Sequence, residues 1–342
     1  MTTTPRDAGF RMPAEWAPHA GCYMAWPCRE PLWGDGLQAA REAYAAVATA
    51  ISKFEPLTML VRPDLMTGAR ELLPASVTVA DMPLNDSWAR DFLPTFVTND
   101  AGQVAGANWR FNCWGNNFPD YAEDAQVAER LLDRLGARRF AAPFVLEGGA
   151  FHVDGEGTIL TTEECLLNPN RNPGLSKAEI EANLKAWLGG ETVVWLGQGY
   201  EGDDTDGHID EIACFAAPGK VLLLDCEDPA DVNYARVQDN IRRLELTKDA
   251  RGRALEVIKL PQPKRRDFDG LRLTLSYTNF YIANGGIVMS AFDDPADAKA
   301  KEIIARCFPD REIIQLNALP ITRGGGGIHC ITQQLPKGEI AR

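Results

Sequence analysis

The order of apolar and polar positions along the chain predicts five amphipathic helices. Apolar residues recur every three or four positions with charges between them, as in "DAQVAERLLDRLG". The pattern covers residues 37–53, 121–136, 177–188, 229–247 and 295–307. Two of these segments carry start signals: Ser176 is a suitable N-cap, and Asp294 precedes Pro295, which suits the first helical position.

Each predicted helix is followed by a short β-like run, and pairs of such runs lie between them. The runs after the helices are "LTMLVR", "FAAPFVL", "ETVVWLG", "LEVIKLP" and "EIIQLNA". The pairs are joined by turn signals near residues 100, 154, 218 and 284. A hairpin, a helix and a further strand thus recur, and the fifth hairpin requires the N-terminal segment to join the C-terminal "GGGGIHCITQQLP". The pattern favours an α/β protein of quasi-equivalent units around an axis; an irregular α/β sheet is the alternative.

Polar residues precede each hairpin at nearly the same offset, where a strand interior should be apolar. The segments are "DSWARD" (86–91), "EGG" (147–149), "DGHIDE" (206–211), "SYTN" (276–279) and "HC" (329–330). If the units surround an axis, these five sets converge. Each set alone also has an ordinary structural interpretation, such as a surface ion pair between Arg90 and Asp91, a loop charge at Glu147 or a packed thiol at Cys330.

The composition narrows the classes of partner. The chain has 342 residues, a net charge of −13 and no basic run, which argues against nucleic acid or an anionic membrane as the main partner. No apolar run reaches the roughly 18 residues of a membrane span, and "MTTTPRDAGF" lacks an apolar signal core, so we expect a cytoplasmic protein. The eight cysteines and four histidines show no metal-ligand spacing, so no metal is expected.

The converging polar residues indicate chemistry on a cation. A thiol beside an imidazole is a nucleophile with an acid/base partner, and surrounding carboxylates favour a positively charged substrate. A guanidinium is planar and can be held by two carboxylates through bidentate bonds, which leaves its carbon open to sulfur. The four glycines 324–327 would let the backbone that carries Cys330 approach such a group.

Seven motifs together resemble those of one enzyme family. They are "RMPAEWAPHAGCYMAWP", "WARDFLPTFV", "FNCWGN", "EGGAFHVDGEGTILTTEECLLNPNRNP", "DDTDGHIDEIACF", "SYTNFYIANGGIVMSAF" and "GGGGIHCITQQLP". The sequence is similar to the agmatine deiminases, a family that also contains bacterial peptidylarginine deiminase and belongs to the guanidine-modifying superfamily of pentein fold. The resemblance covers nearly the whole chain. It implies a five-bladed α/β propeller formed by residues 1–342 as a single domain, in agreement with the repeat.

The resemblance also implies roles for individual residues. Cys330 would be the nucleophile and His208 the acid/base, with Glu147 orienting the His208 ring. The substrate would be bound by Asp91 and Asp210, which grip the guanidinium, and by Trp88, which packs along it. Asn279 is expected near the pocket without an assigned role. His329 is interpreted as structural, because neighbours on an extended segment point to opposite sides.

The implied reaction converts agmatine and water to N-carbamoylputrescine and ammonia through a covalent thiouronium intermediate, in putrescine and polyamine biosynthesis. No cofactor is needed, and a homo-oligomer is expected. Gly327 stands where the family has Asn, and Asn117 where Lys is common, and both bear on the exact substrate. The alternatives are a deiminase of another small guanidine such as arginine or a guanidino acid, with Arg110 as the nearest candidate partner for a carboxylate, an amidinotransferase, or a non-catalytic guanidine-binding pentein.

Overall fold

The computed structural model describes residues 3–342 and contains five units of the predicted order. Each unit has two strands, then a helix, then a third strand. Unit 1 comprises β19 (Thr332–Pro336), β2 (His19–Ala25), α2 (Leu37–Ile51) and β3 (Leu57–Val61). Unit 2 comprises β5 (Thr95–Asn99), β6 (Gln103–Arg110), α6 (Asp124–Leu135) and β7 (Arg139–Val145). Unit 3 comprises β8 (Phe151–Val153), β9 (Thr158–Thr162), α8 (Lys177–Leu188) and β10 (Thr192–Leu196). Unit 4 comprises β11 (Ala213–Ala217), β12 (Lys220–Asp225), α9 (Val232–Glu245) and β13 (Glu256–Pro261). Unit 5 comprises β16 (Tyr281–Ala283), β17 (Gly286–Ala291), α10 (Asp297–Cys307) and β18 (Glu312–Asn317).

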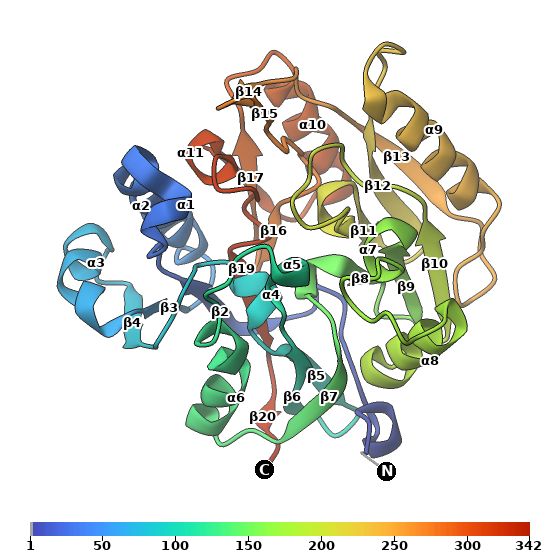
Figure 1. Cartoon of the computed structure of the whole chain (residues 1–342). Coiled ribbons are helices and arrows are strands. Elements are labelled where there is room, and N and C mark those ends of the chain that lie inside the picture. The colour runs from blue at the N-terminus through green and yellow to red at the C-terminus, as the bar shows by residue number, and fades with distance from the viewer. Residues whose placement is uncertain (1–2) are drawn as a thin grey trace.

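The strand pairing is the same in all five units. The first two strands pair antiparallel, and the second pairs parallel with the strand that follows the helix. In unit 1 the antiparallel pair joins the two ends of the chain, with Gln333 opposite Tyr23. The predicted repeat and its closure are therefore confirmed, and Figure 1 shows the five units arranged around a common centre.

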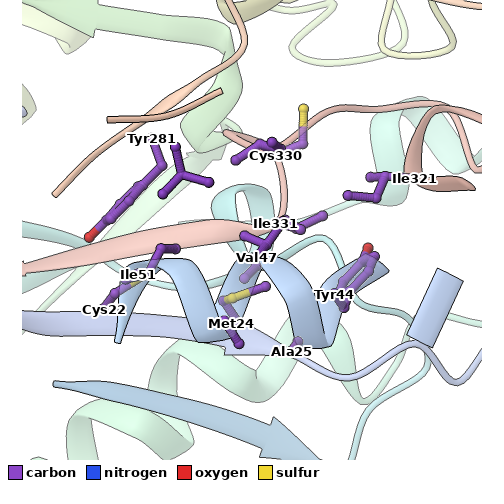
Figure 2. Close-up of a cluster of buried hydrophobic side chains, with 14 of the residues drawn as sticks. Cys22, Met24, Ala25, Tyr44, Val47, Ile51, Tyr281, Ile321, Cys330 and Ile331 are labelled. Carbon is purple, nitrogen blue, oxygen red and sulfur yellow. The ribbon is translucent and has the colours of Figure 1, made fainter. Parts of the chain in front are cut away.

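The helices cover the outside of this arrangement, and several bridge neighbouring units. Helix α9 packs against β10 and β13, α10 against β13 and β18, and α2 against β17 and β18. The packing is close enough to select glycine at one strand position, because a Cβ on Gly106 of β6 would lie 2.4 Å from Leu132 of α6. Figure 2 shows part of the apolar core between α2 and the strands of unit 1, with Met24, Val47 and Ile331 gathered beneath Cys330.

Further short elements extend the repeat, and the sequence pattern did not predict them. They are β1 (Phe10–Arg11), α1 (Glu30–Trp33), α3 (Met66–Leu72), β4 (Val77–Asp81), α4 (Ala89–Phe92), α5 (Cys113–Asn116), α7 (Glu163–Leu166), β14 (Asp267–Phe268), β15 (Leu271–Arg272), α11 (Leu319–Thr322) and β20 (Glu339–Ile340). Short 3₁₀ turns lie at Arg6–Ala8, Gly34–Gly36, Pro63–Leu65, Gly148–Ala150 and Ile209–Glu211.

One predicted helix start is wrong. Helix α10 begins at Asp297, so Pro295 does not occupy the first helical position. The carboxylate of Asp294 accepts a hydrogen bond from the backbone N–H of Ala296, and that of Asp297 accepts one from Asp294, which folds residues 294–296 into a turn. The start of α8 is as predicted, because Ser176 and Glu179 form a capping box. Among residues 3–342 no helix is long and apolar enough to cross a membrane.

Candidate active site

The predicted site residues converge because each lies in the segment just before the first strand of a unit. Asp91 precedes β5, Glu147 precedes β8, His208 and Asp210 precede β11, Asn279 precedes β16 and Cys330 precedes β19. Five of the seven predicted residues line one pocket that encloses about 410 Å³ of empty space, part of it open to solvent. These five are Trp88, Asp91, His208, Asp210 and Cys330. Glu147 and Asn279 do not line the pocket, but each lies beside a residue that does, Glu147 beside His208 and Asn279 beside Cys330.

The Cys330 sulfur stands at the boundary between the apolar core and the pocket. Figure 2 shows the sulfur pointing away from the core, toward which the next residue, Ile331, is directed. The Nδ2 of Asn279 lies 3.1 Å from the sulfur, and the Oε1 of Glu211 lies 3.5 Å from it. Burial, followed by the charges of Asp210 and Glu211, raises the pKa of Cys330 well above that of a free thiol. These surroundings favour the neutral thiol of Cys330 over the thiolate.

The glycine run leaves the space that Cys330 and its neighbours occupy. A Cβ on Gly326 would lie 3.1 Å from the Cys330 sulfur and 2.8 Å from the Trp88 ring. A Cβ on Gly327 would lie 2.4 Å from Oδ1 of Asn279. Any residue larger than glycine at 327 would therefore displace Asn279 from its place beside the Cys330 sulfur.

His208 is buried between two carboxylates. Its Nδ1 lies 3.8 Å from Oδ1 of Asp91 and its Nε2 lies 3.8 Å from Oε2 of Glu147. Burial alone would lower the pKa of His208, but the charge of Asp91, supported by Glu147, raises the pKa well above its ordinary value. Glu147 is held in place by Arg171, whose Nε donates to Oε1 at 2.7 Å and keeps the pKa of Glu147 low despite its burial. The charges that face His208 therefore favour its imidazolium form.

Asp91 receives two hydrogen bonds that fix its carboxylate. The indole N–H of Trp114 donates to Oδ2 and the backbone N–H of Gly149 donates to Oδ1, both at 2.9 Å. Burial nevertheless raises the pKa of Asp91 to about 6. Gly149 sits at the crowded centre, because a Cβ there would lie 2.5 Å from Nδ1 of His208 and 3.0 Å from both Asp91 and Asp210.

Only one of the two carboxylate oxygens of Asp210 has a hydrogen-bond partner among the described residues. Its Oδ2 lies 2.8 Å from Nδ1 of His329, whereas its Oδ1 is buried without a hydrogen-bond partner among the described residues. Burial works against ionisation, but the hydrogen bond and charge of His329 lower the pKa of Asp210 below its ordinary value. The Asp210 carboxylate is thus ionised and has one oxygen available to a ligand.

Sequence reasoning missed several residues of the pocket. Trp114, Phe118, Asp204, Thr205 and Glu211 line it together with the glycines 324–326. Glu211 and Asp204 lie within or beside the "DGHIDE" stretch, and Trp114 lies within "FNCWGN", so their neighbourhood was visible in the motifs although their orientation was not. Trp114 adopts a φ of 53°, a left-handed conformation that aims its indole at Asp91.

Within residues 3–342, three groups of buried side chains have donor atoms close enough to hold a metal ion. They are Glu15 with His152 and His329, Glu147 with Cys165 and His208, and Asp210 with Glu211 and Cys330. In the first two groups a carboxylate is already bonded to an arginine, Arg90 or Arg171. The third group faces the pocket, where its negative charge suits an organic cation equally well. The expectation that the protein uses no metal stays a prediction.

Comparison with known proteins places this pocket in a family context. A family model described as Porphyromonas-type peptidyl-arginine deiminase matches residues 11–336. A protein of Legionella pneumophila, provisionally named an agmatine deiminase, is 52% identical over 99% of this chain and 98% of its own length. An agmatine deiminase of Pseudomonas aeruginosa is 46% identical, with 98% of each chain covered. The solved agmatine deiminase of Enterococcus faecalis superposes with a TM-score of 0.95 at 41% identity, again over 98% of both chains.

Proposed function

Since the chain belongs to the Porphyromonas-type peptidyl-arginine deiminase family, we propose that it is a cysteine hydrolase that converts agmatine and water to N-carbamoylputrescine and ammonia. The observation that carries this proposal is that Cys330, His208, Asp91 and Asp210 line one pocket. Relatives from Pseudomonas aeruginosa and Enterococcus faecalis that bear the name agmatine deiminase support the choice of substrate.

Substrate binding creates the nucleophile. The guanidinium enters between Asp91 and Asp210, and the unpartnered Oδ1 of Asp210 accepts one of its N–H groups. Its positive charge offsets the carboxylates that raise the pKa of Cys330, so the thiol releases its proton to solvent water and becomes the thiolate when the cation arrives. Trp88, stacked on Trp33 with ring centroids 5.8 Å apart, packs along the substrate from the pocket wall.

The reaction then follows in two covalent steps. The Cys330 sulfur bonds to the guanidinium carbon, and the carbon–nitrogen bond breaks as the His208 imidazolium gives its proton to the departing ammonia. An S-alkylthiouronium remains. Water then attacks the same carbon and gives a proton to His208, the carbon–sulfur bond breaks, and the ureido product leaves. The proton on Nδ1 of His208, on the side of Asp91, is the one transferred in both steps, while Glu147 at Nε2 orients the ring.

The mouth of the pocket favours an amine tail over a carboxylate tail. Asp204 lines the pocket, and its side chain is in no hydrogen bond or ion pair within residues 3–342. The amide of Asn117 donates to the backbone carbonyl of Asp204 at 2.7 Å and so braces that segment. Arg110, the cation that a carboxylate-bearing substrate would need, is an exposed side chain bonded to the carbonyl of Pro143 and does not line the pocket.

The test is ammonia release by the purified protein with agmatine, arginine and 4-guanidinobutyrate in parallel, with Cys330→Ala as the control. We expect turnover of agmatine that the control abolishes. Turnover of a carboxylated guanidine would keep the chemistry and overturn the substrate. Transfer of the amidino group to an added amine would indicate an amidinotransferase, and binding without turnover would indicate a non-catalytic protein.

We further propose a cytoplasmic location in polyamine biosynthesis and a homo-oligomeric state. All eight cysteines are free thiols in the described part of the chain, which suits a reducing compartment. The oligomer is proposed only because enzymes of this size commonly form one, and light scattering on the purified protein decides it.

A further inference from the structure

We propose that His329 is a positioning residue of the active site: its imidazolium bridges Asp210 and Glu15, holds the Asp210 carboxylate ionised, and leaves Oδ1 of Asp210 free for the guanidinium. This inference rests on the proposed function, in which Asp210 grips the substrate. It replaces the interpretation of His329 as a merely structural neighbour of Cys330, and it gives a role to Glu15, which the sequence analysis did not single out.

The geometry of the bridge is tight and fully enclosed. Nδ1 of His329 lies 2.8 Å from Oδ2 of Asp210, and Nε2 lies 2.9 and 3.1 Å from the two oxygens of Glu15. All three side chains are at most 4% exposed. The backbone also contributes, because the N–H of His329 donates to Oδ1 of Asn279 at 2.8 Å.

Two carboxylate neighbours determine the charge of the ring. A neutral imidazole donates from one nitrogen only, so its other nitrogen would face carboxylate oxygens without a proton between them. An imidazolium satisfies both contacts with charge-assisted hydrogen bonds. In agreement, Glu15 and Asp210 raise the pKa of His329 against burial and the nearby Arg90, and His329 is the main favourable charge that lowers the pKa of Glu15.

Asp210 needs such a partner because it lies among like charges. Asp91 and Glu211 line the same pocket, and the thiol to be ionised is 3.6 Å from Oδ2 of Asp210. Without the His329 imidazolium, Asp210 would take up a proton and would no longer bind the guanidinium through a charged carboxylate. Each member of the bridge faces further titratable or charged groups. Those beside Asp210 are His208, Asp91, Glu211 and Cys330. Both His329 and Glu15 lie near Arg90 and His152.

Glu15 connects the His329–Asp210 pair to the N-terminal segment of the chain. Its Oε1 also receives Arg90 Nη1 at 3.3 Å, and its Oε2 lies 3.5 Å from Nε2 of His152, whose Nδ1 accepts the backbone N–H of Phe215. The proton of His152 is therefore on Nε2 and points to Glu15. With an arginine and two histidine donors around it, Glu15 stays ionised, and its negative charge keeps the proton on His329.

The experiment measures kcat and KM for agmatine from pH 5 to 9 in the wild-type protein and in His329→Gln. A glutamine amide donates to one carboxylate without carrying charge, so we expect KM to rise at least tenfold at pH 7. We also expect the acidic limb of kcat/KM to move up by about one pH unit and to involve two protons, because Asp210 now titrates together with Asp91. Glu15→Gln, which keeps an acceptor for His329 but removes the charge, should move the limb in the same direction by less.

The matched control is Arg253→Gln. Arg253 donates through Nε to the carboxylate of the buried Asp249, and neither residue lines the pocket or contacts the bridge, so this change likewise removes a cation from a buried carboxylate, but far from the site. It should lower stability without moving the acidic limb. An unchanged limb and KM in folded His329→Gln, or a uniform loss of kcat at every pH, would overturn the proposal; if His329→Gln does not fold, Glu15→Gln decides in the same way.

A failure of the proposed function can be distinguished from a failure of the positioning role of His329. If wild-type protein turns over arginine or another guanidine, that substrate replaces agmatine in the same comparison. If wild-type protein turns over none, agmatine binding to Cys330→Ala is measured by calorimetry at pH 6 and 8 with and without His329→Gln. A loss of affinity that is larger at pH 6 supports the positioning role, whereas an equal affinity in both proteins, or no binding in either, overturns it.

Discussion

At the scale of single residues, burial and neighbouring charges shift the protonation equilibria of the pocket side chains. Burial and the nearby carboxylates raise the pKa of Cys330 and favour its neutral thiol, the charge of Asp91 raises the pKa of His208 and favours its imidazolium, and burial raises the pKa of Asp91 to about 6. Each state follows from removing the group from water and from the charges that face it. The pocket is therefore prepared for a cation, whose arrival favours the ionised form of both Asp91 and Cys330.

The state of Asp91 predicts a pH dependence. The carboxylate binds the guanidinium only when ionised, so its ionised fraction falls as the pH falls through about 6, and kcat/KM should fall with it. The kcat profile reports the bound complex, where the substrate cation keeps Asp91 ionised, and its acidic limb should lie at lower pH. Steady-state rates between pH 4.5 and 8 measure both limbs. A flat kcat/KM between pH 5 and 7 would show that Asp91 is not the group that controls binding.

A methyl group at Gly149 should disable the site. In Gly149→Ala the new Cβ overlaps His208 and crowds both Asp91 and Asp210, so these groups must move apart. We expect kcat/KM to fall at least about 100-fold, with a loss of stability of about 1–3 kcal/mol from overpacking. The rate with agmatine and the urea midpoint measure the two effects.

Gly174→Ala is the matched control, because a Cβ there meets no atom within 4 Å. Near-wild-type activity in Gly149→Ala would mean that the pocket tolerates displacement of these three side chains.

Which site residues were predictable from sequence depended on local geometry. Cys330, His208, Asp91 and Asp210 could be singled out because they stand at equivalent places in the repeat. Glu211 was missed because Asp210 and Glu211 lie in a 3₁₀ turn, where neighbouring side chains need not point to opposite sides as they do on an extended strand. His329 was predicted to be only structural because it neighbours Cys330 on the chain and points away from the pocket. Its ring nevertheless contacts Asp210, a residue that lines the pocket.

At the scale of elements, periodic segments were predictable and short ones were not. The five long helices appear within three residues of the predicted bounds, because an amphipathic period is a local property of the sequence. The two-residue strands β1 and β20 exist only because they pair with β5 and β6, which are remote in sequence. The kinked α5 depends on left-handed residues such as Trp114, whose conformation no propensity would suggest.

The capping box of α8 provides an element-scale prediction. The Ser176 hydroxyl accepts from the backbone N–H of Glu179, whose carboxylate accepts from the backbone N–H of Ser176. Ser176→Ala should lower the free energy of unfolding by about 1 kcal/mol. Urea denaturation measures the loss, and activity should be unaffected because α8 does not reach the pocket.

Ser52→Ala is a suitable comparison, since the hydroxyl of this half-buried serine at the end of α2 contacts the carbonyl of Thr49 and the hydroxyl of Ser76 but caps no N–H group. It should change stability by less than about 0.5 kcal/mol. Equal losses in the two variants would mean that the capping box adds nothing beyond a surface hydroxyl.

At the scale of the whole molecule, unit 1 closes the arrangement because it takes β19 from one end of the chain and β2 from the other. The same closure brings Cys330 to the pocket and Glu15 into contact with His329. The site is thus complete only when both ends of the chain are in place, which is why we propose that residues 1–342 act as one domain. Sequence order alone suggested this closure, but the contacts that hold unit 1 against unit 5 were not visible in it.

Those contacts centre on a buried carboxylate and supply the last prediction. Glu55, just before β3, accepts hydrogen bonds from Tyr281 and from the backbone N–H of Asn284 in unit 5, and its Oε1 lies 3.2 Å from Nδ1 of His19. Glu55→Ala takes the carboxylate partner away from these donors, at about 1–3 kcal/mol each, so we expect stability to fall by at least about 3 kcal/mol. If the five units form one domain, far-UV circular dichroism, tryptophan fluorescence and agmatine turnover should all be lost in a single transition at lower urea than in the wild type.

Glu302→Ala, which removes an exposed pair with Arg306 on α10, should shift that transition by less than about 0.5 kcal/mol. Activity lost well before the circular dichroism signal would instead show that unit 1 detaches from a ring whose other units stay folded.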